Sequence, residues 1–209
     1  MKVEIYSDIA CPWCYIGKRR FERALEAFPG EVEVVYRPYQ LDPSASSDAK
    51  PLMQALAAKF GPQAGAMSGN VTEAARAEGI TMDFEKALSA NTLAAHRLLH
   101  LAEHEYGAAV QRALKEALFE AYFTHGANIG DAEVLAGIAA SVGMDEGRAR
   151  AYLASSEGVA EVKEGIRYAQ QLGISAVPTF VFEGRYGVQG AQPTSTFLQT
   201  LEAVARETV

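Results

Sequence analysis

Both cysteines of the 209-residue chain lie near its start, in the segment CPWC at positions 11–14. Two thiols at this spacing can form half of a zinc site, a pair of inert buried side chains or a redox-active dithiol. A zinc site needs two further ligands, and here only histidines could supply them. The candidates His96, His100 and His104 recur at every fourth position, which is more typical of a partly exposed polar helix face. Redox chemistry is therefore the favoured interpretation, and no metal is expected.

The residues around the two thiols predict where they lie. Residues 2–6 alternate as a strand does, and Pro12 suits the first position of a following helix because that position needs no N–H donor. Cys11 would then be the helix N-cap, where free N–H groups and the helix dipole favour a thiolate. Cys14, one turn further and more buried, would be the resolving thiol. Asp8 could relay the proton of Cys14, or be simply an acid favoured beside a helix N-terminus.

The elements that must position this dithiol are of two kinds, strand-like segments and a long helix-like segment. Strand-like runs occupy 2–6 and 32–36, and they return at 179–190 as a hairpin that turns at Glu183-Gly184. Between them the chain is rich in Ala, Leu and Glu, and residues 108–123 carry one apolar stripe at helical spacing. A final helix follows Pro193. The order predicts one α/β unit split by a long helical insertion, of the kind that builds a lid or a cleft wall.

Composition excludes several function classes. The chain has 19 Lys and Arg against 26 Asp and Glu, a formal net charge of −7, whereas nucleic-acid binding needs a basic face. No polybasic run, no secretory signal pattern and no stretch of ~18 uninterrupted apolar residues is present. We therefore expect a cytoplasmic protein with no nucleic-acid and no membrane partner. In that compartment a purely structural disulfide would be unusual.

Several motifs together resemble one family. CPWC after the first strand and AVPTF at 176–180 resemble the thioredoxin-fold DsbA family. Three further segments resemble the FrnE-like branch of this family: NTLAAHRLLHLA (91–102), LFEAYFTHGANIGD (118–131) and YGVQGAQP (186–193). That branch is similar to 2-hydroxychromene-2-carboxylate isomerases and kappa-class glutathione transferases. The resemblance implies an α/β thioredoxin fold interrupted by a large all-helical insertion. Residues 1–42 and 173–209 would form the thioredoxin-like domain and residues 43–172 the insertion.

The resemblance also implies roles for individual residues. Cys11 would be the nucleophile and Cys14 the resolving cysteine. Pro178 would be a cis-proline that faces the pair, and Val177 would offer its backbone to an extended substrate. The other substrate-binding residues implied are Pro12, Trp13, Asn91, His96, Gly190, Ala191 and Gln192. Asn91 could instead cap a helix, and Gly190 could instead form a turn.

The leading hypothesis is a thiol–disulfide oxidoreductase that exchanges disulfides with protein or small-molecule substrates. It would need no bound cofactor, and glutathione is a candidate co-substrate. The alternatives are a glutathione-binding isomerase or transferase-like protein acting on a small aromatic substrate, and a non-catalytic binding module. The isomerases and kappa transferases carry serine where Cys11 stands, so their glutathione-dependent isomerisation is not carried over. DsbA itself usually has histidine where Trp13 stands, so we expect a milder oxidant. Substitutions at Asn91 or His96 should alter substrate preference more than stability.

Overall fold

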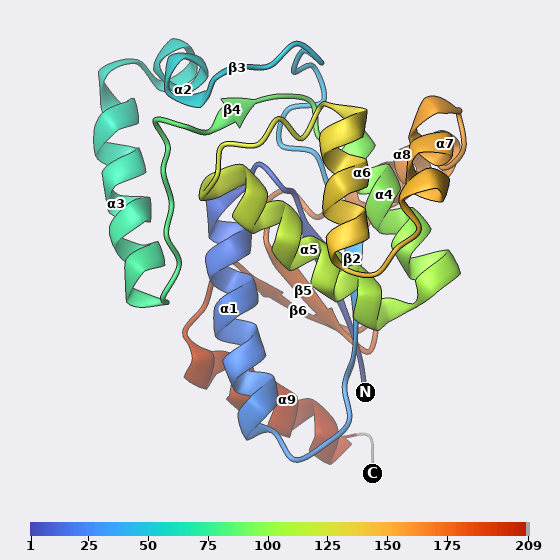
Figure 1. Cartoon of the computed structure of the whole chain (residues 1–209). Coiled ribbons are helices and arrows are strands. Elements are labelled where there is room, and N and C mark those ends of the chain that lie inside the picture. Colours follow the sequence, from blue (N-terminus) through green and yellow to red (C-terminus); the bar gives the residue numbers. More distant parts are fainter. Residues whose placement is uncertain (208–209) are drawn as a thin grey trace.

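The computed structural model describes residues 1–207 and is built on a four-stranded sheet of order β2-β1-β5-β6 (Figure 1). Its strands are β1 (Lys2–Ser7), β2 (Glu33–Pro38), β5 (Thr179–Phe182) and β6 (Tyr186–Gln189). β1 pairs in parallel with β2 and antiparallel with β5, which pairs antiparallel with β6. Helix α1 (Pro12–Ala27) makes the crossover that the parallel pair requires. The predicted strands, hairpin and first helix are thereby confirmed.

The remaining elements connect or flank this sheet. In chain order they are β3 (Lys50–Pro51), α2 (Leu52–Phe60), η1 (Gly61–Gln63), α3 (Ala64–Ala77), β4 (Leu88–Ser89), α4 (Leu93–Leu101), the π-helical η2 (Ala102–Tyr106), α5 (Ala108–Phe123), α6 (Ala132–Ser141), α7 (Glu146–Ala154), α8 (Val159–Gln171) and α9 (Thr194–Glu207). The helix predicted over 108–123 is α5, with the same bounds. No helix within residues 1–207 is both long and apolar enough to cross a bilayer.

The insertion is not entirely helical, which corrects the expectation from sequence. β3 and β4 pair antiparallel, with Lys50 opposite Ser89 and Pro51 opposite Leu88. Just beyond the pair, the Leu52 N–H donates to the Ala87 carbonyl oxygen at 2.8 Å. A pairing of two residues each is made by the backbone and needs no run of β-branched side chains, so it leaves no periodic signal in the sequence.

One face of the sheet packs against α1 and α9 through aromatic rings. Phe180 of β5 lies 5.1 Å from Phe21 of α1 and 4.5 Å from Phe197 of α9, measured between ring centroids. Phe182 also meets Phe21, at 6.1 Å and nearly edge-on. Each buried aromatic side chain of this kind stabilises the fold by about 1.5–3 kcal/mol. This core fixes α1, and with it CPWC, relative to β5.

Helix α8 packs against the other face of the sheet. Ala169 and Ile174, at and just beyond the end of α8, are buried with Tyr6 of β1. Tyr6 points away from the aromatic core because successive side chains of a strand face opposite sides. By sequence α8 falls within the expected insertion, residues 43–172, yet in space it covers the sheet. The proposed boundary at residue 172 stays an expectation.

A second apolar core joins the start of α1 to the insertion. It contains Ile9, Cys14 and Tyr15 together with Leu118 and Phe119 of α5. The Tyr15 and Phe119 rings are stacked, with centroids 4.9 Å apart and an interplanar angle of 9°. The helix that carries the dithiol is therefore packed directly on the insertion.

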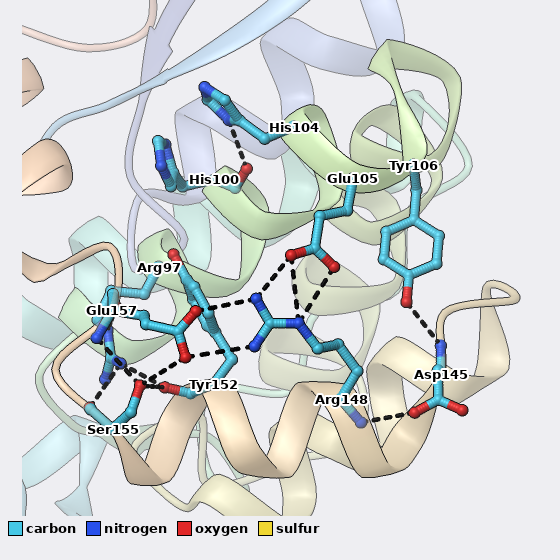
Figure 2. Close-up of polar contacts among 10 residues, drawn as sticks. All are labelled: Arg97, His100, His104, Glu105, Tyr106, Asp145, Arg148, Tyr152, Ser155 and Glu157. Atoms are coloured by element: carbon cyan, nitrogen blue, oxygen red, sulfur yellow. Dashed lines mark hydrogen bonds and ion pairs between the residues drawn. The ribbon is translucent and has the colours of Figure 1, made fainter.

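A buried arginine holds α4 against the connection between α7 and α8 (Figure 2). The guanidinium of Arg97 donates to the carbonyl oxygens of Tyr152 at 2.6 Å, Ser155 at 2.8 Å and Glu157 at 2.9 Å. Charge-assisted bonds to several carbonyls at once leave the guanidinium little freedom. These contacts fix α4, and with it His96, which precedes Arg97 on that helix.

Candidate active site

The segment CPWC forms the N-terminus of α1, and Cys11 is the helix N-cap, as predicted. The backbone of Cys11 is extended (φ −97°, ψ 108°), and Pro12 occupies the first helical turn. The Cys11 sulfur accepts a hydrogen bond from the backbone N–H of Cys14, with N···Sγ 3.3 Å. Free N–H groups and the dipole at a helix N-terminus stabilise negative charge. Cys11 is thus placed where a thiolate is favoured.

The two thiols are free and have different surroundings. Both are buried, with exposed fractions of 4% for Cys11 and 2% for Cys14. Cys11 lines a cavity of about 660 Å³, whereas Cys14 faces the apolar core. Burial raises the pKa of Cys14 well above its usual value, and the neighbouring Cys11 raises it further. Cys14 therefore keeps its proton, while Cys11 is the sulfur that a molecule in the cavity would meet.

The loop before β5 faces this pair. The peptide bond between Val177 and Pro178 is cis, as predicted. The thiol of Cys11 lies 3.6 Å from the carbonyl oxygen of Val177. The carbonyl oxygen of Pro178 accepts a hydrogen bond from Gly190 N–H at 2.7 Å. Gly17 of α1 lies so close to the proline ring that a Cβ there would be 3.0 Å from Pro178 Cγ. The loop is held from both sides.

Asp8 is buried beside the pair and bound by two donors. Its Oδ1 lies 3.1 Å from His96 Nε2, and its Oδ2 accepts the Leu41 N–H at 2.8 Å. Burial alone would raise the pKa of Asp8, but the hydrogen bonds from His96 and Leu41 hold it below its usual value. Burial lowers the pKa of His96. At neutral pH the pair is therefore an aspartate with a neutral imidazole that donates through Nε2.

A buried lysine that the sequence analysis does not single out completes these surroundings. Lys115 of α5 has an exposed fraction of 0%, and its Nζ has no hydrogen-bond partner among residues 1–207. Nζ lies 4.9 Å from the ring centroid of Phe119 and 5.6 Å from that of Tyr36. The sequence did contain a signal for the burial of Lys115, because Lys115 lies four residues before Phe119 on the buried face of α5. Because lysine is so rarely buried, a lysine at this position is predicted to be exposed to solvent.

The charge of Lys115 acts on the dithiol. Cys14 exerts the strongest attraction on the Lys115 ammonium, followed by Asp8 and Cys11. The effect of burial is larger than these attractions, and it lowers the pKa of Lys115 to about 8. The lysine is therefore able to change its protonation state near neutral pH.

The cavity beside Cys11 is mainly apolar. One side is formed by the CPWC segment, with Trp13 41% exposed at the rim. The insertion supplies the opposite wall, as the sequence analysis expects. The apolar residues of that wall are Leu52, Leu56, Phe60, Met67, Val71, Phe84 and Tyr122. Val177 also lines the cavity, so the Cys11 sulfur, a backbone edge and an apolar surface meet in one place.

Asn91 and His96 do not line this cavity. Asn91 donates to the carbonyl oxygens of Pro43 at 3.2 Å and Ala45 at 3.0 Å. Its Oδ1 accepts the Leu93 N–H at 2.9 Å, at the start of α4. Asn91 thus bonds the first N–H of α4 from the position before Thr92, which is the N-cap of that helix. His96 lies between Asp8 and a separate cavity of about 390 Å³. Contacts of Asn91 and His96 with substrate stay predictions.

The residues after β6 form a turn beside the proline loop. Gly190 has φ +83°, a conformation that favours glycine, and its carbonyl oxygen accepts the Gln192 N–H at 2.9 Å. The Gln192 amide donates to the Gln189 carbonyl oxygen at 2.8 Å. The carbonyl oxygen of Ala191 accepts from Arg20 of α1 at 2.6 Å. This turn supports the loop, and its own contacts with substrate stay predictions.

The histidines of α4 and η2 do not converge on the cysteines. The rings of His100 and His104 lie against each other with centroids 4.0 Å apart, and His104 Nδ1 is 2.8 Å from the His100 carbonyl oxygen (Figure 2). Within the described part of the chain, no three His, Cys, Asp or Glu side chains are grouped as a metal site would require. The zinc interpretation has no ligand set there.

Comparisons with known proteins cover nearly the whole chain. The family described as DSBA-like thioredoxin domain matches residues 2–202. The probable DsbA oxidoreductase SCO1869 from Streptomyces coelicolor is 41% identical, with a TM-score of 0.91 over 99% of this chain and 91% of that one. The cytosolic disulfide reductase DsbM from Pseudomonas aeruginosa, solved with GSH, is 21% identical, with a TM-score of 0.69 over 99% and 100%. A 2-hydroxychromene-2-carboxylate isomerase is 15% identical, with a TM-score of 0.72 over 100% and 98%. At these identities, the reductase DsbM and the isomerase are similar to this chain in fold.

Proposed function

Because the chain belongs to the DSBA-like thioredoxin domain family, we propose that it is a thiol–disulfide oxidoreductase that works through Cys11 and Cys14. The observation that carries the proposal is the position of the Cys11 sulfur. It accepts the Cys14 N–H at the start of α1, lies beside the Val177 carbonyl oxygen and opens onto a cavity. A nucleophilic thiolate needs this combination of stabilisation and access.

The exchange takes two steps. The Cys11 thiolate attacks one sulfur of a substrate disulfide, forming a mixed disulfide, and the other substrate sulfur leaves with the electron pair. Cys14 then loses its proton and attacks Cys11, so that the Cys11–Cys14 disulfide forms and the second substrate thiol is released. The substrate gains two electrons and the protein loses two. The reverse sequence oxidises a substrate dithiol, and the relative reduction potentials set the direction.

The surroundings of Cys11 favour an extended substrate with an apolar group. The partly buried backbone of Val177 lines the cavity beside the Cys11 sulfur, where it would offer hydrogen-bonding groups to a peptide in the manner of an added strand. The apolar wall from α2 and α3 would bury a neighbouring apolar or aromatic group. Protein disulfides and small-molecule disulfides both meet these requirements, and glutathione is a candidate co-substrate.

Trapping of mixed disulfides tests the proposal. Cys14→Ala should accumulate disulfide-linked partners through Cys11, because the resolving thiol is missing. Cys11→Ala should accumulate none, and the wild-type protein should reduce insulin with dithiothreitol or glutathione. Equal trapping by both variants, or by neither, would overturn the assignment of roles.

A second candidate function is a glutathione-binding isomerase or transferase-like activity on a small aromatic substrate. The fold shared with 2-hydroxychromene-2-carboxylate isomerase and the apolar cavity favour it. Against it, Cys11 stands where the resemblance to those enzymes calls for serine. Protein that binds glutathione but neither reduces nor isomerises any disulfide would support this second candidate.

We also propose that the exchange takes place in the cytoplasm. DsbM, which shares the fold, is described as a cytosolic reductase. Cell fractionation would give the compartment, and quenching of whole cells in acid followed by alkylation under denaturing conditions at neutral pH would give the redox state of the dithiol. Recovery in an extracytoplasmic fraction with the dithiol fully oxidised would refute this part of the proposal.

A further inference from the structure

We propose that Lys115 accepts the proton of Cys14 when Cys14 attacks the mixed disulfide. The inference rests on the proposed function, because it concerns the second step of that exchange. The step needs an acceptor, since Cys14 is buried in an apolar core and holds its proton. A buried thiol is a poor nucleophile until the proton has moved to another group.

The other charged groups nearby are already occupied. Asp8 accepts hydrogen bonds from His96 and Leu41. Lys18, a second buried lysine, binds Glu22 at 2.9 Å and also Glu116. The pKa of Asp8 is held below its usual value, so its carboxylate is a weak base, and the Lys18 ammonium is held by two carboxylates.

Lys115 differs because its amine is free to exchange a proton. Three buried side-chain polar atoms lack a hydrogen-bond partner within residues 1–207: Ser7 Oγ, Lys115 Nζ and Tyr152 OH. Of these, the amine is the one that acts as a base near neutral pH. The two aromatic rings beside Nζ, those of Tyr36 and Phe119, stabilise the ammonium form when it appears.

The position of Lys115 couples it to the dithiol. Phe119, one turn further along α5, stacks on Tyr15, which adjoins Cys14. The charge of Cys14 acts both on Lys115 and on Tyr36, which lies beside Nζ. The titratable groups that face Lys115 from the surrounding elements are Cys11, Cys14 and Lys18 of α1, Asp8 before α1, Tyr36 of β2 and His96 of α4.

The proton and the electrons balance in this step. The neutral Lys115 amine takes the proton from the Cys14 S–H group, and the Cys14 sulfur attacks Cys11. The Cys11–Cys14 bond forms as the bond from Cys11 to the substrate sulfur breaks, and the electron pair leaves on the substrate. Lys115 ends as an ammonium ion that the aromatic rings of Tyr36 and Phe119 flank. The lowered pKa of Lys115, about 8, allows both forms near neutral pH.

Release of a chromophoric thiol tests the role directly. The mixed disulfide of Cys11 with 2-nitro-5-thiobenzoate is formed, and release of the thiolate by Cys14 is followed by stopped flow as a function of pH. In wild-type protein the rate should rise with a midpoint near pH 8. Lys115→Met should slow release at pH 7 by about tenfold or more and remove that midpoint, as loss of a general base does. Lys115→Arg keeps the charge but cannot accept a proton, so it should not restore the rate.

Two controls separate the proposal from a structural effect. Lys18→Met removes a buried lysine of the same size and should keep a titration midpoint, moved somewhat upward because the charge of Lys18 lowers the pKa of Lys115. Carbon-13 spectra of the lysine side chains in wild-type protein should show one lysine that titrates near pH 8 and shifts when Cys11 is blocked. That measurement needs no variant and stands if Lys115→Met fails to fold.

The outcomes are distinct. Release by Lys115→Met at the wild-type rate and with the wild-type pH profile would overturn the role of Lys115 while leaving the oxidoreductase intact. Absence of any lysine titrating below pH 9 in the wild-type spectra would also overturn it. Wild-type protein that neither releases the thiolate nor reduces insulin would overturn the proposed function itself.

Discussion

The backbone N–H of Cys14 donates to the sulfur of Cys11 at 3.3 Å, so the main chain of one cysteine stabilises charge on the side chain of the other. The same first turn of helix buries the Cys14 sulfur in the apolar core. One helix terminus therefore makes two chemically different thiols from identical side chains.

This asymmetry predicts selective alkylation. With iodoacetamide at pH 7, Cys11 should be labelled at least about tenfold faster than Cys14, because each unit of pKa changes the thiolate fraction tenfold. The pKa of Cys14 is raised well above its usual value by burial. Peptide mass spectrometry gives the two rates, and in Cys11→Ala the remaining thiol should stay unlabelled under native conditions. Equal labelling would contradict the asymmetry.

Trp13 should report the redox state. It is the only tryptophan and lies between the two cysteines, partly exposed at the cavity. Its fluorescence should change when the disulfide forms, which allows a titration against glutathione buffers. We expect a potential of about −270 to −200 mV, because Trp13 brings no positive charge to the dithiol, and not DsbA's roughly −120 mV. A value near the latter would mean that other residues set the potential.

His96 should matter for stability through its bond to Asp8. His96→Ala removes one of the two donors to a buried carboxylate, which should lower the free energy of unfolding by about 3 kcal/mol. His96→Gln keeps an N–H donor and should lower the free energy of unfolding clearly less than His96→Ala does. Urea unfolding measures both, and equal losses would show that the hydrogen bond is not what His96 contributes.

The same pair predicts a pH dependence. The pKa of His96 is lower in the folded protein than its unfolded value of about 6.5, so the unfolded state binds more protons below that pH. Stability should therefore fall as the pH drops below about 6.5, and this part of the loss should be absent in His96→Gln. The pKa of Asp8 is also lowered, so its contribution is present above about pH 4 and is lost as the pH falls through its folded pKa. An identical slope in wild type and variant between pH 5 and pH 7 would contradict the assignment.

Gly17 should be needed for activity more than for folding. An alanine Cβ there would lie 3.0 Å from Pro178 Cγ and 3.4 Å from Ala191, so the loop facing Cys11 must shift. Turnover in Gly17→Ala should fall by about an order of magnitude, because small misplacements at a reacting centre are costly. Gly137→Ala is the matched control: a Cβ there meets nothing within 4 Å, and the helix should gain up to about 1 kcal/mol. Full activity in Gly17→Ala would show that the loop adapts.

Features encoded by neighbouring residues were predictable. Pro12 at the first helical position gives the start of α1, and Glu183 and Gly184, both with positive φ, form the predicted turn. The dithiol and the cis-proline loop were predicted on motifs of a few residues each. The mutual position of these short segments came from the family resemblance and not from periodicity.

Features that depend on distant partners were missed. His96 lies 88 positions from Asp8, and nothing local in α4 indicates that its side chain binds a buried carboxylate. Asn91 and His96 both make hydrogen bonds that hold the fold, and their expected effect on substrate preference stays a prediction. Lys115 was missed although its spacing from Phe119 places it on the apolar face of α5, because lysine is so rarely buried.

Strand β1 is an interior strand whose two neighbours are made at very different times. Its partner β2 follows shortly, but β5 begins at residue 179. A ribosome adds about 5–20 residues each second, so roughly ten to thirty-five seconds pass between synthesis of β1 and of β5. During that interval the nascent chain carries an open sheet edge and two thiols that lack the Pro178 loop. During synthesis both thiols are therefore open to the oxidants and thiols that surround the nascent chain.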